Sequence, residues 1–293
     1  MRTQTTLNII GCGRVGQTLG RLWHEQGVFA LQDVHTRSLA TAMQAVAFMG
    51  AGRAAASVQD MRVADVWMLA VPDTQLAAAA AQLAGHARPG LGPTGGAGDK
   101  ARPIAFHCSG FLASSVLQAL RDQGWAVASA HPVLSFASPA SAVQQFAGTP
   151  CGLEGDAAAS ATLGAALAAI GGECFALTAA DKPLYHAAAV FATNFVPVLQ
   201  GLASDLWRDT GVPPALIPRL GATLLRNAVD NVLSLGAAGA LTGPAARGDT
   251  AVVQAQGEAV SRWNPLAGDA YRALSALAME LARSRAAQTG PPL

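Results

Sequence analysis

Short apolar runs and amphipathic segments alternate along the first 178 residues. The run at 64–71 is almost continuously apolar, as expected of a strand buried on both faces of a sheet. Predicted strands are 7–10, 28–35, 64–71, 103–109, 126–132, 149–155 and 173–178, and predicted helices are 14–26, 39–48, 74–84, 113–123 and 157–170. This alternation predicts an α/β fold of the Rossmann type, with a doubly wound and mainly parallel sheet.

The pattern changes after Thr178, where only helical periodicity remains. Helices are predicted at 181–209, 213–235, 249–261 and 264–287. We therefore predict a dinucleotide-binding Rossmann domain at 1–178, followed by an all-helical domain at 179–293 that serves substrate binding and dimerisation. The Gly- and Pro-rich segment at 85–103 has no periodicity and is expected to be a loop peripheral to function.

Composition narrows the functional classes. Hydrophobic residues make up 51% of the chain, charged residues 13%, and the net charge is +1. Neither nucleic acid nor a membrane surface is an expected partner, because no basic block or global field is present. The longest apolar stretch, 187–199, contains Asn194 and Pro197 and is shorter than the ~18 residues of a membrane span. With no signal-peptide pattern at the start, a cytoplasmic protein is expected.

Four cysteines stand far apart, and none forms a CxxC pair. They are Cys12, Cys108, Cys151 and Cys174. This spacing predicts reduced thiols and no metal site.

A glycine motif follows the first predicted strand and opens the first predicted helix. It reads Gly11-Cys12-Gly13-Arg14-Val15-Gly16, the GxGxxG spacing of dinucleotide-binding loops. In such loops the first glycine allows a tight turn, the second lets backbone approach a pyrophosphate, and the third lets the helix pack on the strand. The free N–H groups of the helix would then face the phosphates. The alternative is an ordinary glycine-rich turn.

The end of the second predicted strand indicates which dinucleotide binds. An acidic residue there usually holds the free ribose 2′-OH of NAD. In this chain Asp33 comes earlier, inside the strand, and the tip carries Thr36, Arg37 and Ser38. Hydroxyl and guanidinium donors match a 2′-phosphate, so NADP is predicted over NAD. Arg37 could instead be an ordinary surface arginine.

Three further strand ends carry candidate residues. Backbone of Ala70, Val71 and Pro72 is expected to pass the cofactor, with Asp73 as a helix cap. Ser109 and His131 could contact the nicotinamide or a substrate carbonyl. For the neighbouring His107 a satisfied core position is the alternative, as a helix cap is for Ser109, and Cys108 has no activating partner.

The predicted helix after the domain break carries three polar residues in an alanine-rich stretch. Lys182 and His186 lie on one face at 100° per residue, and Asn194 lies about 80° from His186. We expect His186 and Asn194 to face a cleft and Lys182 to be solvated surface. His186 or His131 would be the general acid or base, because imidazole titrates near neutral pH.

Several motifs together resemble an uncharacterised bacterial family that joins an NADP-type Rossmann domain to a helical domain of unknown function. They are GxGxxG with "TRS", "AVPD", "HCSG", "HPVLSFA", "DKPLYHAAAVFATNF" and "ALTGPAARGD". The architecture is similar to pyrroline-5-carboxylate reductase, ketopantoate reductase, prephenate dehydrogenase and the β-hydroxyacid dehydrogenases. The resemblance implies an active cleft lined by the helix after the break, with His186 and Asn194 contributing. The chain departs from the β-hydroxyacid pattern, because no Lys and Asn stand four apart on this helix.

The resemblance also implies a role for "ALTGPAARGD", since a comparable C-terminal segment approaches the substrate site in those reductases, often across a dimer. Thr242 and Arg247 are the candidates for binding an anionic substrate, and the alternative is a helix connection capped by Asp249.

The leading hypothesis is an NADP-dependent oxidoreductase that acts on a small carbonyl, imine or hydroxy compound in the interdomain cleft, and forms a homodimer. Ser109 and Asn194 would orient the substrate oxygen. A second hypothesis is a non-catalytic NADP(H)-binding sensor or scaffold, since fold alone does not fix function. A third, a methyltransferase, would leave the "HTRS" segment unexplained.

Overall fold

The computed structural model describes residues 4–86 and 102–289, so most of the predicted 85–103 loop lies outside the described residues. The chain divides into two compact units, Met1–Val190 and Phe191–Leu293. This division comes later than the boundary predicted after residue 178. Helix α7 (Lys182–Ala189) belongs to the first unit because its first residue, Lys182, buries its side chain there.

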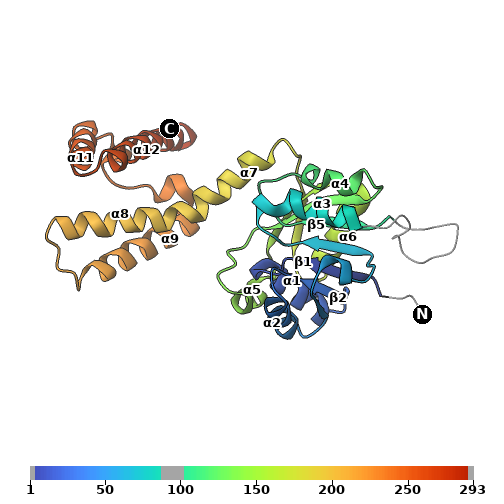
Figure 1. Ribbon diagram of the computed structural model, residues 1–293. Coiled ribbons are helices and arrows are strands. Elements are labelled where there is room, and N and C mark those ends of the chain that lie inside the picture. The colour runs from blue at the N-terminus through green and yellow to red at the C-terminus, as the bar shows by residue number, and fades with distance from the viewer. Residues whose placement is uncertain (1–3, 87–101, 290–293) are drawn as a thin grey trace. The chain divides into compact units, whose positions relative to one another are not determined.

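An eight-stranded sheet forms the centre of the first unit (Figure 1). The strands are β1 (Thr6–Ile10), β2 (Ala30–His35), β3 (Arg53–Ala55), β4 (Val66–Leu69), β5 (Ile104–His107), β6 (Ala126–Pro132), β7 (Pro150–Gly155) and β8 (Glu173–Ala176). Their order is β3-β2-β1-β4-β5-β6-β7-β8, and every neighbouring pair is parallel except β6 with β7. The first six strands have the Rossmann order, which confirms the predicted fold class.

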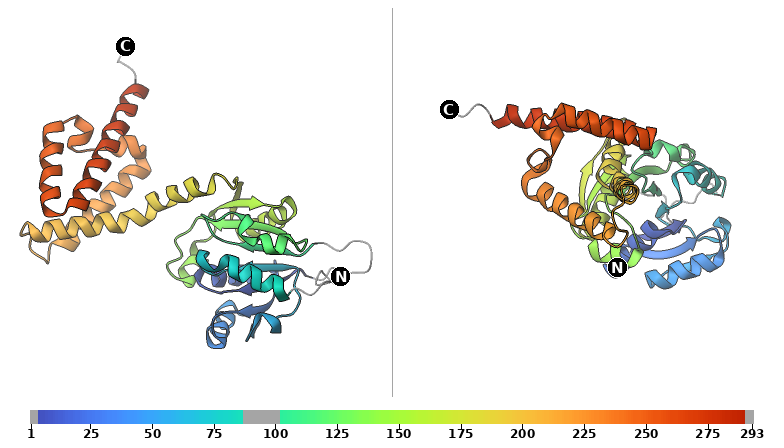
Figure 2. Two further views of the ribbon diagram at one scale, coloured as in Figure 1. Left: turned by 45° about the horizontal axis from the view of Figure 1, so that its top comes forward. Right: turned by 90° about the vertical axis from the view of Figure 1, so that its left-hand side faces the viewer.

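Helices cover both faces of this sheet (Figures 1 and 2). One apolar core lies under α1 (Arg14–Glu25), α2 (Leu39–Met49) and α6 (Ala157–Ala168), and the other under α3 (Leu76–His86) and α4 (Gln118–Arg121). Trp23 is fully buried and its indole N–H donates to the Ala166 carbonyl at 2.8 Å, which ties α1 to α6. Burial on two faces explains why the central strands are nearly all apolar.

Several short elements were not predicted, among them β3 and α5. Strand β3 has three residues, of which only Ala55 is buried, so it leaves no apolar run in the sequence. Helix α5 (Pro139–Gln145) is capped by Ser138, whose hydroxyl accepts a hydrogen bond from the Ser141 N–H. The helix predicted at 113–123 is divided into a 3₁₀ turn, η3 (Ser114–Leu117), and α4.

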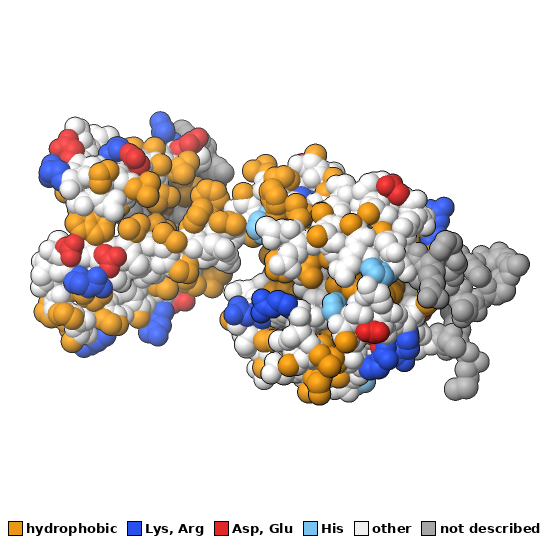
Figure 3. Space-filling view, in the orientation of Figure 1, with side chains coloured by type: hydrophobic (Ala, Val, Ile, Leu, Met, Phe, Trp, Pro, Cys, Tyr) orange, Lys and Arg blue, Asp and Glu red, His pale blue; other side chains and the backbone are white. Residues whose placement is uncertain are grey.

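The described part of the second unit is helical, as the sequence predicts. Its helices are α8 (Phe195–Asp209), α9 (Ile217–Ala240), α10 (Pro244–Arg247), α11 (Thr250–Trp263) and α12 (Pro265–Thr289). The π-helical turn η4 (Val190–Asn194) connects α7 to α8. Buried residues are few in this unit, and many large apolar side chains are exposed, including Val198, Leu224 and Leu233. Figure 3 shows hydrophobic side chains on the surface of these helices.

One helical run is longer than the apolar stretch seen in the sequence. By length and composition, Lys182–Asp209 could cross a membrane, with a mean hydropathy of 1.4 over its most apolar window. The Lys182 side chain, at its start, is buried in the α/β unit.

Candidate active site

The glycine loop after β1 has the predicted turn geometry. Gly11 has a φ of 73°, and an added Cβ would lie 2.5 Å from Val71 Cγ1 and 2.8 Å from the Ala70 carbonyl oxygen. A Cβ on Gly16 would lie 3.1 Å from the Ala70 side chain. The loop therefore packs tightly on the end of β4, with Pro72 next along the chain; Gly11 can only be glycine, and a Cβ at Gly16 would need Ala70 to shift by a few tenths of an ångström.

Gly13 is different, because nothing lies within 4 Å of the position of an added Cβ. The first hydrogen bond within α1 runs from the Gln17 N–H to the Gly13 carbonyl at 3.0 Å, so the N–H groups of Arg14, Val15 and Gly16 have no acceptor in the helix. An open loop beside a helix N-terminus fits a pyrophosphate. Cys12 can offer only backbone here, since its side chain is buried, which raises the pKa of the thiol to about 12.

The residues predicted to select NADP surround the N-terminus of α2. The Ser38 hydroxyl accepts from the Thr41 N–H at 3.3 Å, and the Thr36 hydroxyl donates to the Ser38 carbonyl at 2.8 Å. Both hydroxyls therefore stabilise the start of the helix. Arg37 is exposed and makes no hydrogen bond or ion pair within the described residues. Its guanidinium is thus available to an anion.

Asp33 is occupied by two arginines. Its fully buried carboxylate accepts from Arg53 Nε and from Arg62 Nη2, each at 2.8 Å. Burial alone would raise its pKa, but the hydrogen bonds from the two arginines outweigh burial and hold the pKa below its usual value. The one acidic residue of β2 is therefore committed to an internal ion pair.

Ser109, after β5, closes a turn with its hydroxyl. The oxygen accepts from the N–H groups of Phe111 and Leu112 at 3.1 and 2.9 Å and donates to Asp73 Oδ2 at 2.7 Å. The expectation that Asp73 caps a helix is wrong, because its carboxylate accepts this hydroxyl and makes no cap hydrogen bond to η2 (Asp73–Gln75). The hydroxyl of Ser109 has little capacity left for a substrate.

His107 is a satisfied core histidine, the alternative kept open by the sequence. Its Nε2 lies 3.2 Å from the Ala113 carbonyl, and its Nδ1 accepts from the Ser109 N–H at 3.1 Å. Burial, the largest effect, lowers its pKa to about 4. Cys108 is similarly inert, since burial raises the pKa of its thiol well above the ordinary value.

The prediction that Lys182 lies on the solvated surface is wrong. The side chain is 0% exposed, and its amino group donates to the Ser109 carbonyl at 3.0 Å and to the Ser129 hydroxyl at 2.8 Å. Burial lowers its pKa, while the charges of Glu154 and Asp73 act in the opposite direction. The helical position of Lys182 gave no sign of this, because both acceptors belong to residues more than 50 positions away in the sequence.

His131, Tyr185 and His186 form a cluster beside Gly110. The Tyr185 hydroxyl lies 2.8 Å from His131 Nδ1, and the two imidazole rings are 6.0 Å apart. A Cβ on Gly110 would lie 2.8 Å from His131 Nε2 and 2.5 Å from His186 Cδ2. The sequence prediction included both histidines but missed Tyr185, whose only signal was its position next to His186.

Burial lowers the pKa of His131 to about 4, with further lowering by the charges of Lys182 and His186. This imidazole is therefore neutral near pH 7, so it has no imidazolium proton to give to a substrate. Burial also raises the pKa of the Tyr185 phenol to about 12, so the phenol keeps its proton.

The remaining candidates lie in the second unit. Asn194 is exposed, and its side-chain oxygen accepts from the Thr193 hydroxyl at 2.8 Å. Thr242 is exposed as well, and Arg247 donates to Asp249 at 3.0 Å. The roles expected for these residues stay predictions.

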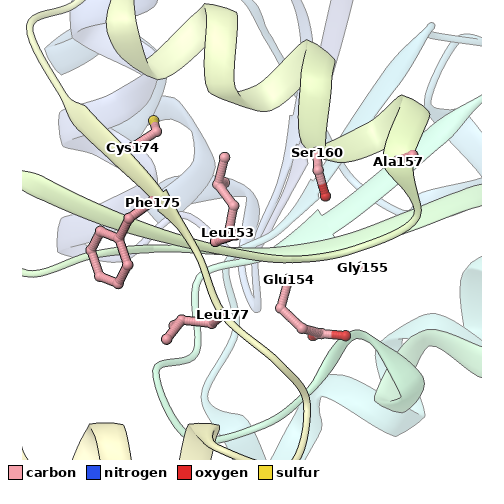
Figure 4. Close-up of a pocket in the computed structure, with 9 residues that line it drawn as sticks. Leu153, Glu154, Gly155, Ala157, Ser160, Cys174, Phe175 and Leu177 are labelled. Atoms are coloured by element: carbon pink, nitrogen blue, oxygen red, sulfur yellow. The ribbon is translucent and has the colours of Figure 1, made fainter.

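A separate open pocket lies between β7, α6 and β8 (Figure 4). Its volume is about 310 Å³, and its lining includes Glu154, Ser160 and Phe175 but no residue predicted for the active site. Among the residues that the structure describes, no group of three or more His, Cys, Asp or Glu side chains is placed to hold a metal ion.

Comparisons agree with this architecture. Residues 149–278 match DUF2520, a domain of unknown function. The match begins within the α/β unit, at β7, and continues through most of the helical unit. Among curated proteins, none matches the chain.

Solved structures similar to the whole chain include protein TM1727 from Thermotoga maritima, which is 26% identical with a TM-score of 0.72 and covers 96% of this chain and 99% of its own. A reductive aminase from Aspergillus terreus in complex with NADPH and ethyl levulinate is 17% identical, with a TM-score of 0.63 and coverage of 96% and 95%. A pyrroline-5-carboxylate reductase from Coxiella burnetii is 13% identical, with a TM-score of 0.56 and coverage of 95% and 99%.

The identities to the aminase and the pyrroline-5-carboxylate reductase are low, so these two similarities establish the fold. Residues 149–278 are therefore similar to DUF2520, and the chain has the Rossmann-like fold seen in these two reductases, in agreement with the resemblance inferred from its motifs.

Proposed function

We propose that this protein is an NADP-dependent oxidoreductase that transfers a hydride between the nicotinamide and a small carbonyl, imine or hydroxy compound. One observation carries the proposal. The open glycine loop after β1 and the His131–Tyr185–His186 cluster beside the end of β6 lie at the same edge of the sheet, because β1, β4, β5 and β6 are parallel. Ligands of open α/β sheets bind at this carboxyl edge.

The choice of NADP over NAD depends on charge at the end of β2. Asp33 is held by Arg53 and Arg62, so it is not available to a ribose 2′-OH. Arg37, exposed and unpaired among the described residues, can instead bind a 2′-phosphate beside the N-terminus of α2. NADP, when bound, would supply the hydride acceptor or donor.

His131 and His186 would take different roles in this reaction. A neutral His131 cannot give up an imidazolium proton near pH 7, but it can donate a hydrogen bond from Nε2 if Tyr185 donates to Nδ1. His186 is half-buried and makes no hydrogen bond within the described residues, which leaves it free to exchange a proton with the substrate.

The direct test is NADPH oxidation measured against a panel of keto acids, ketones and ketone–amine mixtures, with NADP reduction measured against hydroxy acids and amines. In parallel, NADPH and NADH binding are compared by calorimetry for the parent protein and for Arg37→Ala. We expect NADPH to bind more tightly, and Arg37→Ala to weaken NADPH by roughly tenfold, the worth of one charged hydrogen bond, while NADH is unchanged. Arg208→Ala, in the second unit, is the matched control.

A non-catalytic NADP(H) sensor remains the second candidate, and a specific observation favours it. The Ser109 hydroxyl and the Lys182 amino group, two groups able to assist catalysis, are both committed to internal hydrogen bonds. NADPH binding without turnover of any compound in the panel, and without an effect of His186→Ala, would support the sensor.

We also propose that the helical unit pairs with a second copy of the chain. Among the residues of this unit for which burial is described, 191–284, five are buried, and they are Ile217, Gly221, Gly257, Ala267 and Gly268. Exposed large apolar side chains occur on α8, α9, α11 and α12. A patch of this kind on several helices is typical of an obligate interface, since an isolated soluble domain exposes little contiguous apolar surface.

A further inference from the structure

Gly110 is a buried residue, and its N–H has no hydrogen-bond partner among the described residues. Its neighbours are all satisfied, since the Ser109 N–H donates to His107 and the N–H groups of Phe111 and Leu112 donate to the Ser109 hydroxyl. Orphaned buried N–H groups are rare because leaving one unpaired is unfavourable. A ligand oxygen at this point would satisfy it.

Lys182 determines which way this N–H points. The Ser109 carbonyl, in the same peptide unit, accepts from Lys182 Nζ at 3.0 Å and from Ser129 Oγ at 3.1 Å. In a planar trans peptide the carbonyl and the N–H point in opposite directions. Holding the carbonyl toward Lys182 therefore turns the Gly110 N–H away from the lysine.

Around Gly110 lie groups that can donate hydrogen bonds. A Cβ added to Gly110 would lie 2.8 Å from His131 Nε2 and 2.5 Å from His186 Cδ2, closer than real Cβ contacts, so both imidazoles pack directly against this glycine. The nearest carboxylate of the turn, Asp73, is engaged by Ser109. Hydrogen-bond donors placed close together suit an oxygen that carries negative charge.

The amino group of Lys182 also makes the Gly110 N–H a stronger hydrogen-bond donor. Lys182 donates to the Ser129 hydroxyl, which donates in turn to the Ser109 carbonyl, and the ammonium also donates to that carbonyl directly. Hydrogen bonds in such a chain polarise one another, so the N–H at the other end of the peptide becomes a better donor.

We propose that Lys182 is a positioning residue that fixes the Ser109–Gly110 peptide, so that the Gly110 N–H and the His131 imidazole together bind one carbonyl or carboxylate oxygen of the substrate. The proposal rests on the proposed function, because it names the oxygen-binding part of the same site. Lys182 itself stays buried behind the peptide and does not touch the substrate.

The test follows backbone amides directly by NMR, on the full chain labelled with ¹⁵N-glycine. The Gly110 signal is identified by its loss in Gly110→Ala, and acetate serves as the simplest carboxylate probe. We expect acetate to shift the Gly110 amide saturably, and we expect Lys182→Met to weaken that binding roughly tenfold while the protein stays folded. No shift in the parent protein, or equal affinity in Lys182→Met, would overturn the proposal.

Because Lys182→Met removes a buried group and could fail to fold, Ser129→Ala provides a second variant. It deletes the bridging hydroxyl but keeps the ammonium, and it should weaken acetate binding by a smaller factor. If Lys182→Met does not fold, an acetate affinity of Ser129→Ala equal to that of the parent protein would overturn the proposed hydrogen-bond chain.

Titration with NADPH separates this inference from the proposed function. NADPH is expected to shift the Gly13 amide in the parent protein and in Lys182→Met. If NADPH does not shift the Gly13 amide but acetate shifts the Gly110 amide, the cofactor proposal is refuted and the oxygen-binding proposal stands. If NADPH shifts the Gly13 amide but acetate does not shift the Gly110 amide, the oxygen-binding proposal is refuted and the cofactor proposal stands.

Discussion

The phenol oxygen of Tyr185 lies 2.8 Å from Nδ1 of His131, and the two rings meet edge to face with their centroids 5.6 Å apart. Burial keeps the phenol protonated and the imidazole neutral near pH 7, since it raises the pKa of Tyr185 to about 12 and lowers that of His131 to about 4. The phenol can therefore donate to Nδ1 and leave the imidazole proton on Nε2. This contact selects the tautomer that faces Gly110.

Replacing Tyr185 by Phe removes only this hydrogen bond. We expect NADPH-coupled turnover to fall roughly tenfold or more, while the free energy of unfolding falls by only about 1 kcal/mol, the net worth of one hydrogen bond. Steady-state kinetics and urea unfolding measure the two effects. The matched control is Tyr271→Phe, the other tyrosine of the chain, whose hydroxyl donates to Gln256 in the second unit. An equal loss of turnover in the control would contradict the role given to Tyr185.

Stability should depend on pH through His107 and His131. Each has a pKa of about 4 in the folded state, below the ~6.5 of an unfolded histidine. The unfolded chain therefore binds more protons between these values, so the stabilisation is present above pH 6.5 and is lost as pH falls toward 4. Each histidine can contribute a slope of up to roughly 1.4 kcal/mol per pH unit.

Urea unfolding at several pH values between 4.5 and 6.5 measures this slope. The lowered pKa of Asp33 acts in the same direction, but at lower pH, outside this window. We expect His107→Gln and His131→Gln each to reduce the slope, whatever they do to stability at pH 7. A slope that neither substitution changes would show that other groups cause the dependence.

Much of the α/β unit could be predicted because its signals are local. The strand at 126–132 is observed with the same bounds, and the Gly50 that ends α2 has a φ of 78°. A strand buried on both faces is mostly apolar, and a helix often ends at glycine. Strand β3 was missed because it pairs on one side only and needs just one buried residue, Ala55.

The site was less predictable because its contacts join helix α7 to residues of β6 and of the turn after β5 that are far away in the sequence. Helical periodicity places Lys182 and His186 on one face, but it cannot tell which part of that face packs into the sheet. Lys182 meets Ser129 and the Ser109 carbonyl, and Tyr185 meets His131, at separations of 53 to 73 residues. A buried lysine at such a point breaks the ordinary rule for charged residues, as functional sites often do.

Alanine substitutions at Gly11 and Gly13 should have different effects, the first on protein stability and the second on cofactor binding. Gly13 has a φ of −73°, and its Cβ would meet nothing, so Gly13→Ala should change the free energy of unfolding by less than about 1 kcal/mol but block the approach of a pyrophosphate. Gly11→Ala should instead destabilise the fold by roughly 2 kcal/mol or more, because of its positive φ and its clash with Val71 and Ala70. Thermal melts and NADPH calorimetry on both variants measure the contrast. Tight NADPH binding by Gly13→Ala would exclude this loop as the phosphate site.

The proposed pairing of two copies predicts a dimer of a 29.6 kDa chain in size-exclusion chromatography with light scattering. Val198 in α8 and Leu224 in α9 are 57% and 54% exposed. A carboxylate at either position would be buried and unpaired in an interface, which costs several kcal/mol, so Val198→Asp and Leu224→Asp should each shift the protein toward monomer at micromolar concentration.

Met43, in α2 of the first unit, offers a matched control for this experiment, because it is an apolar side chain with 59% exposure. Met43→Asp adds the same charge at a similar exposure but outside the helical unit, so it should leave the dimer intact. If the parent protein is a monomer at all concentrations, the exposed apolar helices need another explanation. A dimer that Met43→Asp disrupts, and the two helical variants do not, would move the interface to the α/β unit.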